Sequence, residues 1–191
     1  MSRLQPISGT EIVDDIRLGH TWDEYNALLG FIKNQHHQWF VEVGVHEGGL
    51  SYLLLPELSG EKDYLGIELD CGLVRPEVKS RYKEYPSELL CANCFSTDVS
   101  IRVSSMSSKI IYCDGGNKAK ELAHFKHFCK KGDIIMSHDF HDGKREIKGV
   151  PDVHPEVTPE DVRHLDLSHD FVRVGDNEFK KTRIIGWRKT E

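Results

Sequence analysis

The stretch from Phe40 to Ser51 constrains the fold more than any other part of this chain. A run of β-branched and aromatic residues that contains Glu42 breaks at a glycine-rich turn and leads into an apolar helical pattern. Open α/β sheets place a small nucleotide-like ligand at the carboxyl end of such a strand. A carboxylate at Glu42 would repel a pyrophosphate, so the turn favours a cationic or hydroxyl-bearing ligand. The stretch therefore predicts a strand, a ligand-binding turn and a helix.

Strand-like and helix-like segments alternate along most of the chain. A first helix is expected over 22–32, where Thr21 and Glu24 form a capping box. Further helices are expected at 51–55 (stopped near Pro56), 73–82 and 119–128, and buried strands at 41–45, 63–69, 88–95, 109–114 and 133–137. This alternation predicts an α/β fold, a Rossmann-like and mostly parallel sheet with helices on both faces.

The segment 140–170 differs in character from the rest. It is polar, contains three prolines and carries a good helix start at Thr158 and Pro159. Long insertions at the carboxyl ends of strands tend to be functional, so we expect this segment to act as a substrate lid.

The last part of the chain predicts a hairpin. Segments 171–174 and 183–187 flank a glycine-containing turn, which indicates an antiparallel end to the sheet. The whole chain, 1–191, has the size of a single domain, in which 1–37 is expected to be an N-terminal helical cap.

The composition argues against several classes of partner. Twenty-five basic and 31 acidic residues give a formal net charge of −6 without a long basic run, which disfavours nucleic acid. No apolar run has the length of a membrane span and the N-terminus does not begin a signal peptide, so we expect a cytoplasmic protein. The five cysteines are expected to be reduced thiols, with Cys91 and Cys94 interpreted as strand and turn residues.

Polar residues stand at the ends of all five predicted strands. They are Glu42, Glu68, Asn93, Asp114 and the adjacent His138 and Asp139. Because the carboxyl ends of parallel strands meet at one edge of a sheet, we expect these side chains to face one crevice. Glu68 stands where a carboxylate accepts hydrogen bonds from both hydroxyls of a ribose.

Two of these strand ends resemble motifs of a known family. Residues 42–49 (E-x-G-x-x-x-G-G) resemble motif I of class I S-adenosylmethionine-dependent methyltransferases, and residues 66–70 resemble the second-strand motif of the same family. The branch that the chain resembles most is the metal-dependent O-methyltransferases, which include catechol-type, macrocin, rhamnosyl and cephalosporin-hydroxylase-like proteins. The resemblance covers about residues 41–186.

The resemblance implies S-adenosylmethionine as the cofactor. It implies that Glu42, Gly44 and Gly48 line the methionine part of this cofactor, that Glu68 binds the ribose, and that the Asn93 turn lies near the adenine. The full set of cofactor-binding residues that it implies is Glu42, Gly44, Glu47, Gly48, Gly49, Glu68, Asn93 and Asp114.

The resemblance also implies a divalent metal. In the catechol-type branch the fourth strand ends with an aspartate ligand and the fifth with two adjacent ligands, which match Asp114, His138 and Asp139. Mg²⁺ prefers oxygen at all three positions, whereas a histidine ligand favours Mn²⁺, Fe²⁺ or Zn²⁺. The alternative is that His138 hydrogen-bonds a neighbouring loop and Asp139 caps the turn.

The predicted reaction is methyl transfer to a hydroxyl group of a small-molecule or saccharide acceptor. A metal would lower the pKa of that hydroxyl. Without a metal, His138 or His141 is the candidate base and Lys118 is a third candidate, although Lys118 is expected to face water in the first turn of its helix. A homo-oligomer is compatible with the sequence.

Two other classes of function compete with this interpretation. A nucleotide-dependent oxidoreductase needs a G-x-G-x-x-G turn, and residues 44–49 do not supply it. A hydroxylase-like or non-catalytic nucleotide-binding domain would keep the fold without this chemistry, but carboxylates at the ends of the first, second and fourth strands argue against such a loss.

Overall fold

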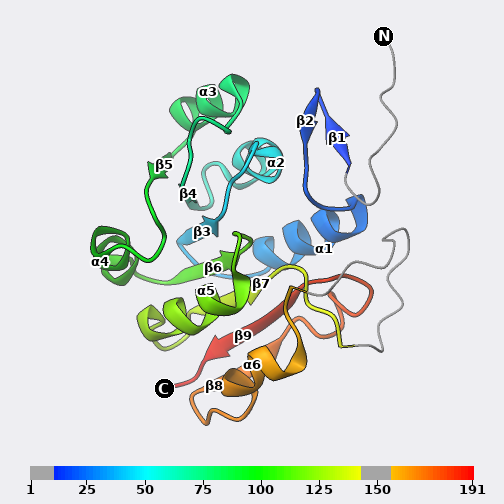
Figure 1. Ribbon diagram of the computed structural model, residues 1–191, viewed down its shortest axis with the longest axis vertical. Helices are drawn as coiled ribbons and strands as arrows, with labels where there is room; N and C mark the ends of the chain where they lie inside the picture. The colour runs from blue at the N-terminus through cyan, green and yellow to red at the C-terminus, as the bar shows by residue number, and fades with distance from the viewer. Residues whose placement is uncertain (1–10, 143–155) are drawn as a thin grey trace.

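A seven-stranded sheet runs through the computed structural model, which describes residues 11–142 and 156–191 (Figure 1). Its strands, in spatial order, are β5 (Ser87–Cys91), β4 (Asp63–Glu68), β3 (Trp39–Val43), β6 (Lys109–Cys113), β7 (Ile134–Ser137), β9 (Ile185–Lys189) and β8 (Phe171–Val174). The first five are parallel, and β9 is antiparallel to both β7 and β8. The predicted Rossmann-like sheet and its C-terminal antiparallel hairpin are confirmed.

Strand β3 lies where the order of the sheet reverses. It pairs with β4 on one side and with β6 on the other, so that Val43 lies opposite both Ile67 and Cys113. In open α/β sheets, ligands bind in the crevice at such a switch point, outside the carboxyl ends of the strands. The glycine-rich turn after Val43 therefore stands at the centre of the carboxyl edge.

Helices cover both faces of the sheet (Figure 1). One face carries α1 (Trp22–Lys33), α2 (Gly49–Leu58) and α3 (Pro76–Glu84), and the other carries α4 (Thr97–Ser105), α5 (Lys118–Phe125), the 3-10 helix η1 (Lys126–Phe128) and α6 (Pro159–Asp166). Each layer buries its own apolar cluster against the sheet. None of the described helices is long and apolar enough to cross a membrane.

The N-terminal segment is only partly helical. A small antiparallel hairpin, β1 (Ile12–Val13) with β2 (Ile16–Arg17), precedes α1, and residues 1–10 lie outside the described residues. Strands of two residues are too short to show a period in the sequence. The predicted capping box is confirmed, since Thr21 Oγ1 accepts from the Glu24 amide and the Glu24 carboxylate accepts from the Thr21 amide.

Helix α2 continues through Pro56, where we expected it to stop. A proline inside a helix leaves the carbonyl four residues earlier without its usual donor. Here that carbonyl belongs to Tyr52 and accepts a hydrogen bond of 2.5 Å from Arg81 Nη1. The arginine on α3 thus replaces the lost bond and allows the helix to run on to Leu58.

The predicted lid, 140–170, is described only in part, and the described part contains the helix α6. Residues 143–155 lie outside the described residues. Helix α6 buries Val162 and Leu165 in the cluster beneath β8, so it packs on a face of the sheet rather than over its carboxyl edge. Among the described residues of the segment, Phe140 and Val157 form a bridge beside the end of β7.

Two cysteines are paired, which corrects the expectation of reduced thiols. Cys71 and Cys91 form a disulfide with their Cα atoms 5.6 Å apart. Cys91 ends β5 directly opposite Glu68, and the chain turns back after Asp70, whose side chain accepts from the Gly72 amide. The pairing depends on the register of two strands, which the spacing of the cysteines does not reveal. The free cysteines are Cys94, Cys113 and Cys129.

Candidate cofactor and acceptor site

A cavity of about 610 Å³ opens at the carboxyl edge of the sheet. Its lining includes residues from the ends of all five parallel strands, among them Glu42, Gly44, Glu68, Asn93, Asp114, His138 and Asp139. Arg17, Leu18 and Gly19, which follow the N-terminal hairpin, close one side. The strand ends that the sequence placed at one crevice are therefore brought together.

The glycine turn is shaped by close backbone contacts. A Cβ atom on Gly44, which has φ +89°, would lie 2.3 Å from Gly115 Cα, and one on Gly49 would lie 2.2 Å from the Arg17 carbonyl oxygen. Only glycine fits such approaches. Gly48 has φ +93° and precedes α2 as its N-cap.

The second half of the turn does not line the cavity. Gly48 and Gly49 form the start of α2, and the Glu47 carboxylate accepts from the Arg17 amide at 3.4 Å. These three residues were predicted to bind the cofactor, and they are not among the residues that line the cavity; Glu47 and Gly49 lie against the segment at Arg17.

Glu42 is buried rather than solvated. Its carboxyl group accepts hydrogen bonds from Ser51 and, at 2.7 Å, from Tyr64. Burial, aided by the charges of Asp114 and Glu68, raises the pKa of Glu42 to about 8 even though the two hydroxyl donors lower it. Glu42 is therefore mostly neutral at pH 7, and the expected repulsion of a pyrophosphate by its charge does not follow.

Glu68 holds its position through backbone donors. One carboxylate oxygen accepts from the His46 amide at 2.7 Å, and the other accepts from the Asp70 amide at 3.0 Å. These bonds tie the glycine turn to the end of β4 and aim an acidic group at the cavity. Asn93 stands at the next strand end, where its side chain accepts from the Phe95 amide.

A cluster of charges lies at the other end of the cavity, around Asp114, His138 and Asp139. Lys118 Nζ is 3.0 Å from Asp139 Oδ2, 3.7 Å from Asp114 Oδ1 and 2.5 Å from Glu156. Arg183 Nη1 is 2.5 Å from Asp139 Oδ1. Lys118 is 5% exposed, so the expectation that it faces water is wrong; the neighbouring carboxylates draw its side chain inward.

The charges of this cluster fix its protonation. Burial lowers the pKa of His138, but Asp114, Glu24 and Asp139 more than reverse this and raise it to about 9. Burial raises the pKa of Asp114, yet His138, His20 and Lys118 lower it to about 2. The pKa of Lys118 is raised by Asp114 and Asp139 against the effect of burial. His138 and Lys118 are thus cations at neutral pH.

Several residues of the cluster had no sequence signal. His20 is fully buried, with Nε2 2.8 Å from the Tyr112 hydroxyl and 3.5 Å from Asp114 Oδ2. Glu24, which the sequence explained as a capping residue, also pairs with Arg183 Nε at 2.8 Å.

His141 lies just beyond the cluster. Its backbone amide donates to the Val157 carbonyl at 3.0 Å, and its side chain is not part of the cavity lining. The structure therefore brings His138 to the cavity end. Lys118 pairs with two acids that line the cavity, Asp114 and Asp139, but neither Lys118 nor His141 lines it.

Known structures agree with this architecture. No protein-family model and no curated protein matches the sequence. An apo structure of CmcI-N160 superposes with a TM-score of 0.67 at 13% identity, covering 95% of this chain and 76% of that one. The O-methyltransferase TomG from Streptomyces achromogenes, solved with S-adenosylmethionine, gives 0.62 at 16% identity, covering 91% and 82%. This chain has an O-methyltransferase fold.

A third neighbour with the methyltransferase fold is an enzyme from Geobacter sulfurreducens, with a TM-score of 0.57 at 19% identity and coverage of 93% and 82%. At these identities the likeness establishes the fold. It is the fold that the motif resemblance implied.

The residues present fit both predicted groups. A cavity of about 610 Å³ lies within the usual range for small-molecule sites, and Glu68 offers acceptor oxygens for a diol. Imidazole and carboxylate donors from His20, Asp114 and His138 lie within 4.8 Å of one another, which suits a metal ion. Asp139, predicted as a ligand, is instead held between Lys118 and Arg183.

Proposed function

We propose that this protein transfers a methyl group from S-adenosylmethionine to a hydroxyl group of a small-molecule or saccharide acceptor. One observation carries the proposal: a single cavity joins an acidic strand end suited to a ribose, Glu68, to a polar cluster around Asp114 and His138. Methyl transfer needs this combination of a nucleoside-binding end and an acceptor-binding end in one enclosure.

In this proposal the cofactor lies along the ends of β4, β3 and β6. Glu68 would accept hydrogen bonds from the ribose hydroxyls, and the Asn93 loop would lie beside the adenine. Gly44 lets the backbone approach the methionine part closely, while Glu42 and Asp114 border the same region. Glu47, Gly48 and Gly49 would act by shaping the turn.

At the acceptor end, the chain supplies positive charge. His138 and Lys118 are cations at neutral pH, so they suit stabilisation of the oxygen as its proton leaves better than they suit removal of that proton. His141, at the border of the cavity, is the remaining predicted base. The side chains of Asp114 and Asp139 hold the two cations in place.

A divalent metal would complete the site. When bound, such an ion lowers the pKa of a hydroxyl that coordinates it. Asp114 and His138, two of the predicted ligands, face each other at 3.2 Å, and binding of a cation there would have to displace the proton that His138 otherwise holds.

The test is calorimetry with S-adenosylmethionine and S-adenosylhomocysteine. We expect binding by the wild-type chain, and Glu68→Gln should raise the dissociation constant roughly 10- to 100-fold, because it weakens hydrogen bonds made by a charged acceptor. Glu61→Gln, at an exposed position, is the matched control and should bind as the wild type does.

The acceptor is then sought by measuring S-adenosylhomocysteine release with a panel of hydroxylated small molecules and sugars. Absence of cofactor binding at millimolar concentration would contradict the proposal. Binding without turnover of any acceptor would favour the alternative of a non-catalytic nucleotide-binding domain.

A further inference from the structure

His20 brings a third donor to the cluster around Asp114 and His138. Its Nε2 lies 3.5 Å from Asp114 Oδ2, and its ring stacks on that of His138 with centroids 4.1 Å apart. On the other side of the same carboxylate, His138 Nδ1 lies 3.2 Å from Oδ1. Ligands about 2.1 Å from one cation stand roughly 3 to 4 Å apart, so these spacings are those of a metal-binding set.

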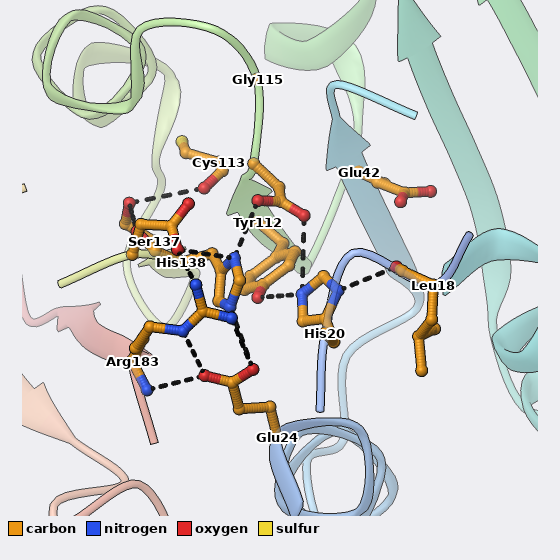
Figure 2. Close-up of polar contacts among 12 residues, drawn as sticks. Leu18, His20, Glu24, Glu42, Tyr112, Cys113, Gly115, Ser137, His138 and Arg183 are labelled. Atoms are coloured by element: carbon orange, nitrogen blue, oxygen red, sulfur yellow. Dashed lines mark hydrogen bonds and ion pairs between the residues drawn. The ribbon is translucent and has the colours of Figure 1, made fainter. Parts of the chain in front are cut away.

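Acceptor oxygens lie beside the far nitrogens of both imidazoles, although His138 Nε2 makes no hydrogen bond to its neighbour. His20 Nδ1 is 3.2 Å from the Leu18 carbonyl oxygen, and His138 Nε2 is 3.4 Å from Glu24 Oε2 (Figure 2). A carbonyl or a carboxylate can only accept, so each far nitrogen is placed to carry a ring hydrogen. The near nitrogen of His20 then turns its lone pair toward Asp114, and that of His138 would do so once a cation displaces its proton. Metal-binding histidines are held in this way.

The contact with Tyr112 indicates that His20 Nε2 carries a lone pair rather than a hydrogen. With Nδ1 of His20 donating to Leu18, the Tyr112 hydroxyl at 2.8 Å donates to Nε2. Asp114 Oδ2 faces the same nitrogen without a hydrogen between them. A cation between the two would replace this unfavourable approach of two acceptors with two coordinate bonds, at the loss of one hydrogen bond from tyrosine.

Asp139 is engaged elsewhere. Its two carboxylate oxygens lie 3.0 Å from Lys118 Nζ and 2.5 Å from Arg183 Nη1. Both side chains are cations, so a third cation on this carboxylate would be repelled by each of them. The structure therefore favours His20 over Asp139 as the third donor.

We propose that His20, Asp114 and His138 together bind one divalent transition-metal ion, with His20 in the position that the family resemblance gives to Asp139. Two imidazoles and one carboxylate favour Zn²⁺ or Fe²⁺ over Mg²⁺. The inference rests on the proposed function, since it names the metal ligands of the same cavity. It also makes the segment before α1 part of the site.

The first test uses the full wild-type chain after treatment with EDTA. Calorimetric titration with Zn²⁺ should show one tight site, and pulsed electron paramagnetic resonance with less than one equivalent of Cu²⁺ should show two coordinated imidazoles. A single imidazole would indicate the set Asp114, His138 and Asp139 and would overturn the proposal. Absence of Zn²⁺ binding would overturn it as well.

The second test compares variants in the same titration. His20→Gln should weaken Zn²⁺ binding at least about tenfold. His36→Gln, at an exposed histidine, should leave the affinity unchanged, and Asp139→Asn should change it less than His20→Gln does. Unchanged affinity in His20→Gln would overturn the proposal.

Cofactor calorimetry on the same samples separates the two proposals. A His20→Gln chain that still binds S-adenosylhomocysteine is folded, so its loss of Zn²⁺ affinity can be assigned to the missing ligand. If that variant does not fold, the imidazole count of the wild type decides. Zn²⁺ binding without cofactor binding in the wild type would leave the metal site standing and contradict the methyl-transfer proposal.

Discussion

At the scale of single residues, the protonation of buried acids differs from what the sequence suggests. Glu42 and Asp114 both end or follow strands at the same edge, yet the pKa of Glu42 is raised to about 8 and that of Asp114 is lowered to about 2. Glu42 meets only hydroxyl groups, whereas Asp114 meets His138 and Lys118. Neutral hydroxyl donors do not offset the loss of hydration of a buried charge, but cations do.

This difference predicts a pH dependence of stability. The folded-state pKa of Glu42 lies above the ordinary value of 4.5, so the folded protein binds more protons between about pH 4.5 and 8. The free energy of unfolding should therefore fall as the pH rises through this window. Glu42→Gln should remove this fall, and the variant should gain stability relative to wild type by up to roughly 5 kcal/mol at pH 9.

Denaturant unfolding at pH 5, 7 and 9 measures this difference. The exposed Glu61→Gln is the control and should stay parallel to the wild type. If Glu42→Gln and the wild type keep the same pH profile, Glu42 does not hold its proton in the folded state.

At the scale of elements, the sequence predicted the interiors of helices and strands better than the residues at which they begin and end. The strands around Val41, Leu65 and Ile111 are mostly apolar because both faces of the sheet are covered, and this composition is visible in the sequence. The extension of α2 past Pro56 was not visible, since it depends on Arg81 of another helix.

The residues of the candidate site were also only partly predictable from the sequence. Asp114 and His138 were predicted because strand ends meet at one edge. His20 and Arg183 were missed because they reach the site from outside the parallel strands, by contacts between segments far apart in the chain. Patterns within a segment do not encode such contacts.

The loops after β4 and β5 carry a prediction of their own. The disulfide between Cys71 and Cys91 joins the loop that follows Glu68 to the strand end that precedes Asn93, so it braces both sides of the proposed adenosine end. The bridge closes a sequence separation of 20 residues. Replacing both cysteines by serine should cost about 3 kcal/mol of stability.

The double variant should also bind S-adenosylhomocysteine several-fold more weakly, because two cofactor loops lose a common restraint. Urea unfolding with and without a reducing agent measures the stability change, and Cys94→Ser, which removes a free thiol of the same loop, serves as the control. An unfolding midpoint of the wild type that is insensitive to reduction would count against this role.

At the scale of the whole molecule, one arginine connects three parts of the chain. Arg183, just before β9, pairs with Glu24 of α1 and with Asp139 after β7. Glu24 is 1% exposed, and its pKa is held low by His138 and Arg183 against the effect of burial. The N-terminal helix, the acceptor end of the cavity and the C-terminal hairpin are therefore linked through one guanidinium group.

Arg183→Met should consequently affect the whole fold. Removing one member of a buried ion pair leaves its partners uncompensated and costs about 3–5 kcal/mol, which for a chain of this size lowers the melting temperature by roughly 6–20 °C. Arg183→Lys keeps the charge but not both ion pairs, so its melting temperature should lie between those of Arg183→Met and the wild type. Arg163→Met, which removes a pair between exposed side chains, should have almost no effect. Thermal unfolding followed by circular dichroism distinguishes these outcomes; equal melting temperatures for Arg183→Met and Arg163→Met would mean that the hairpin, the helix and the site are held together without this arginine.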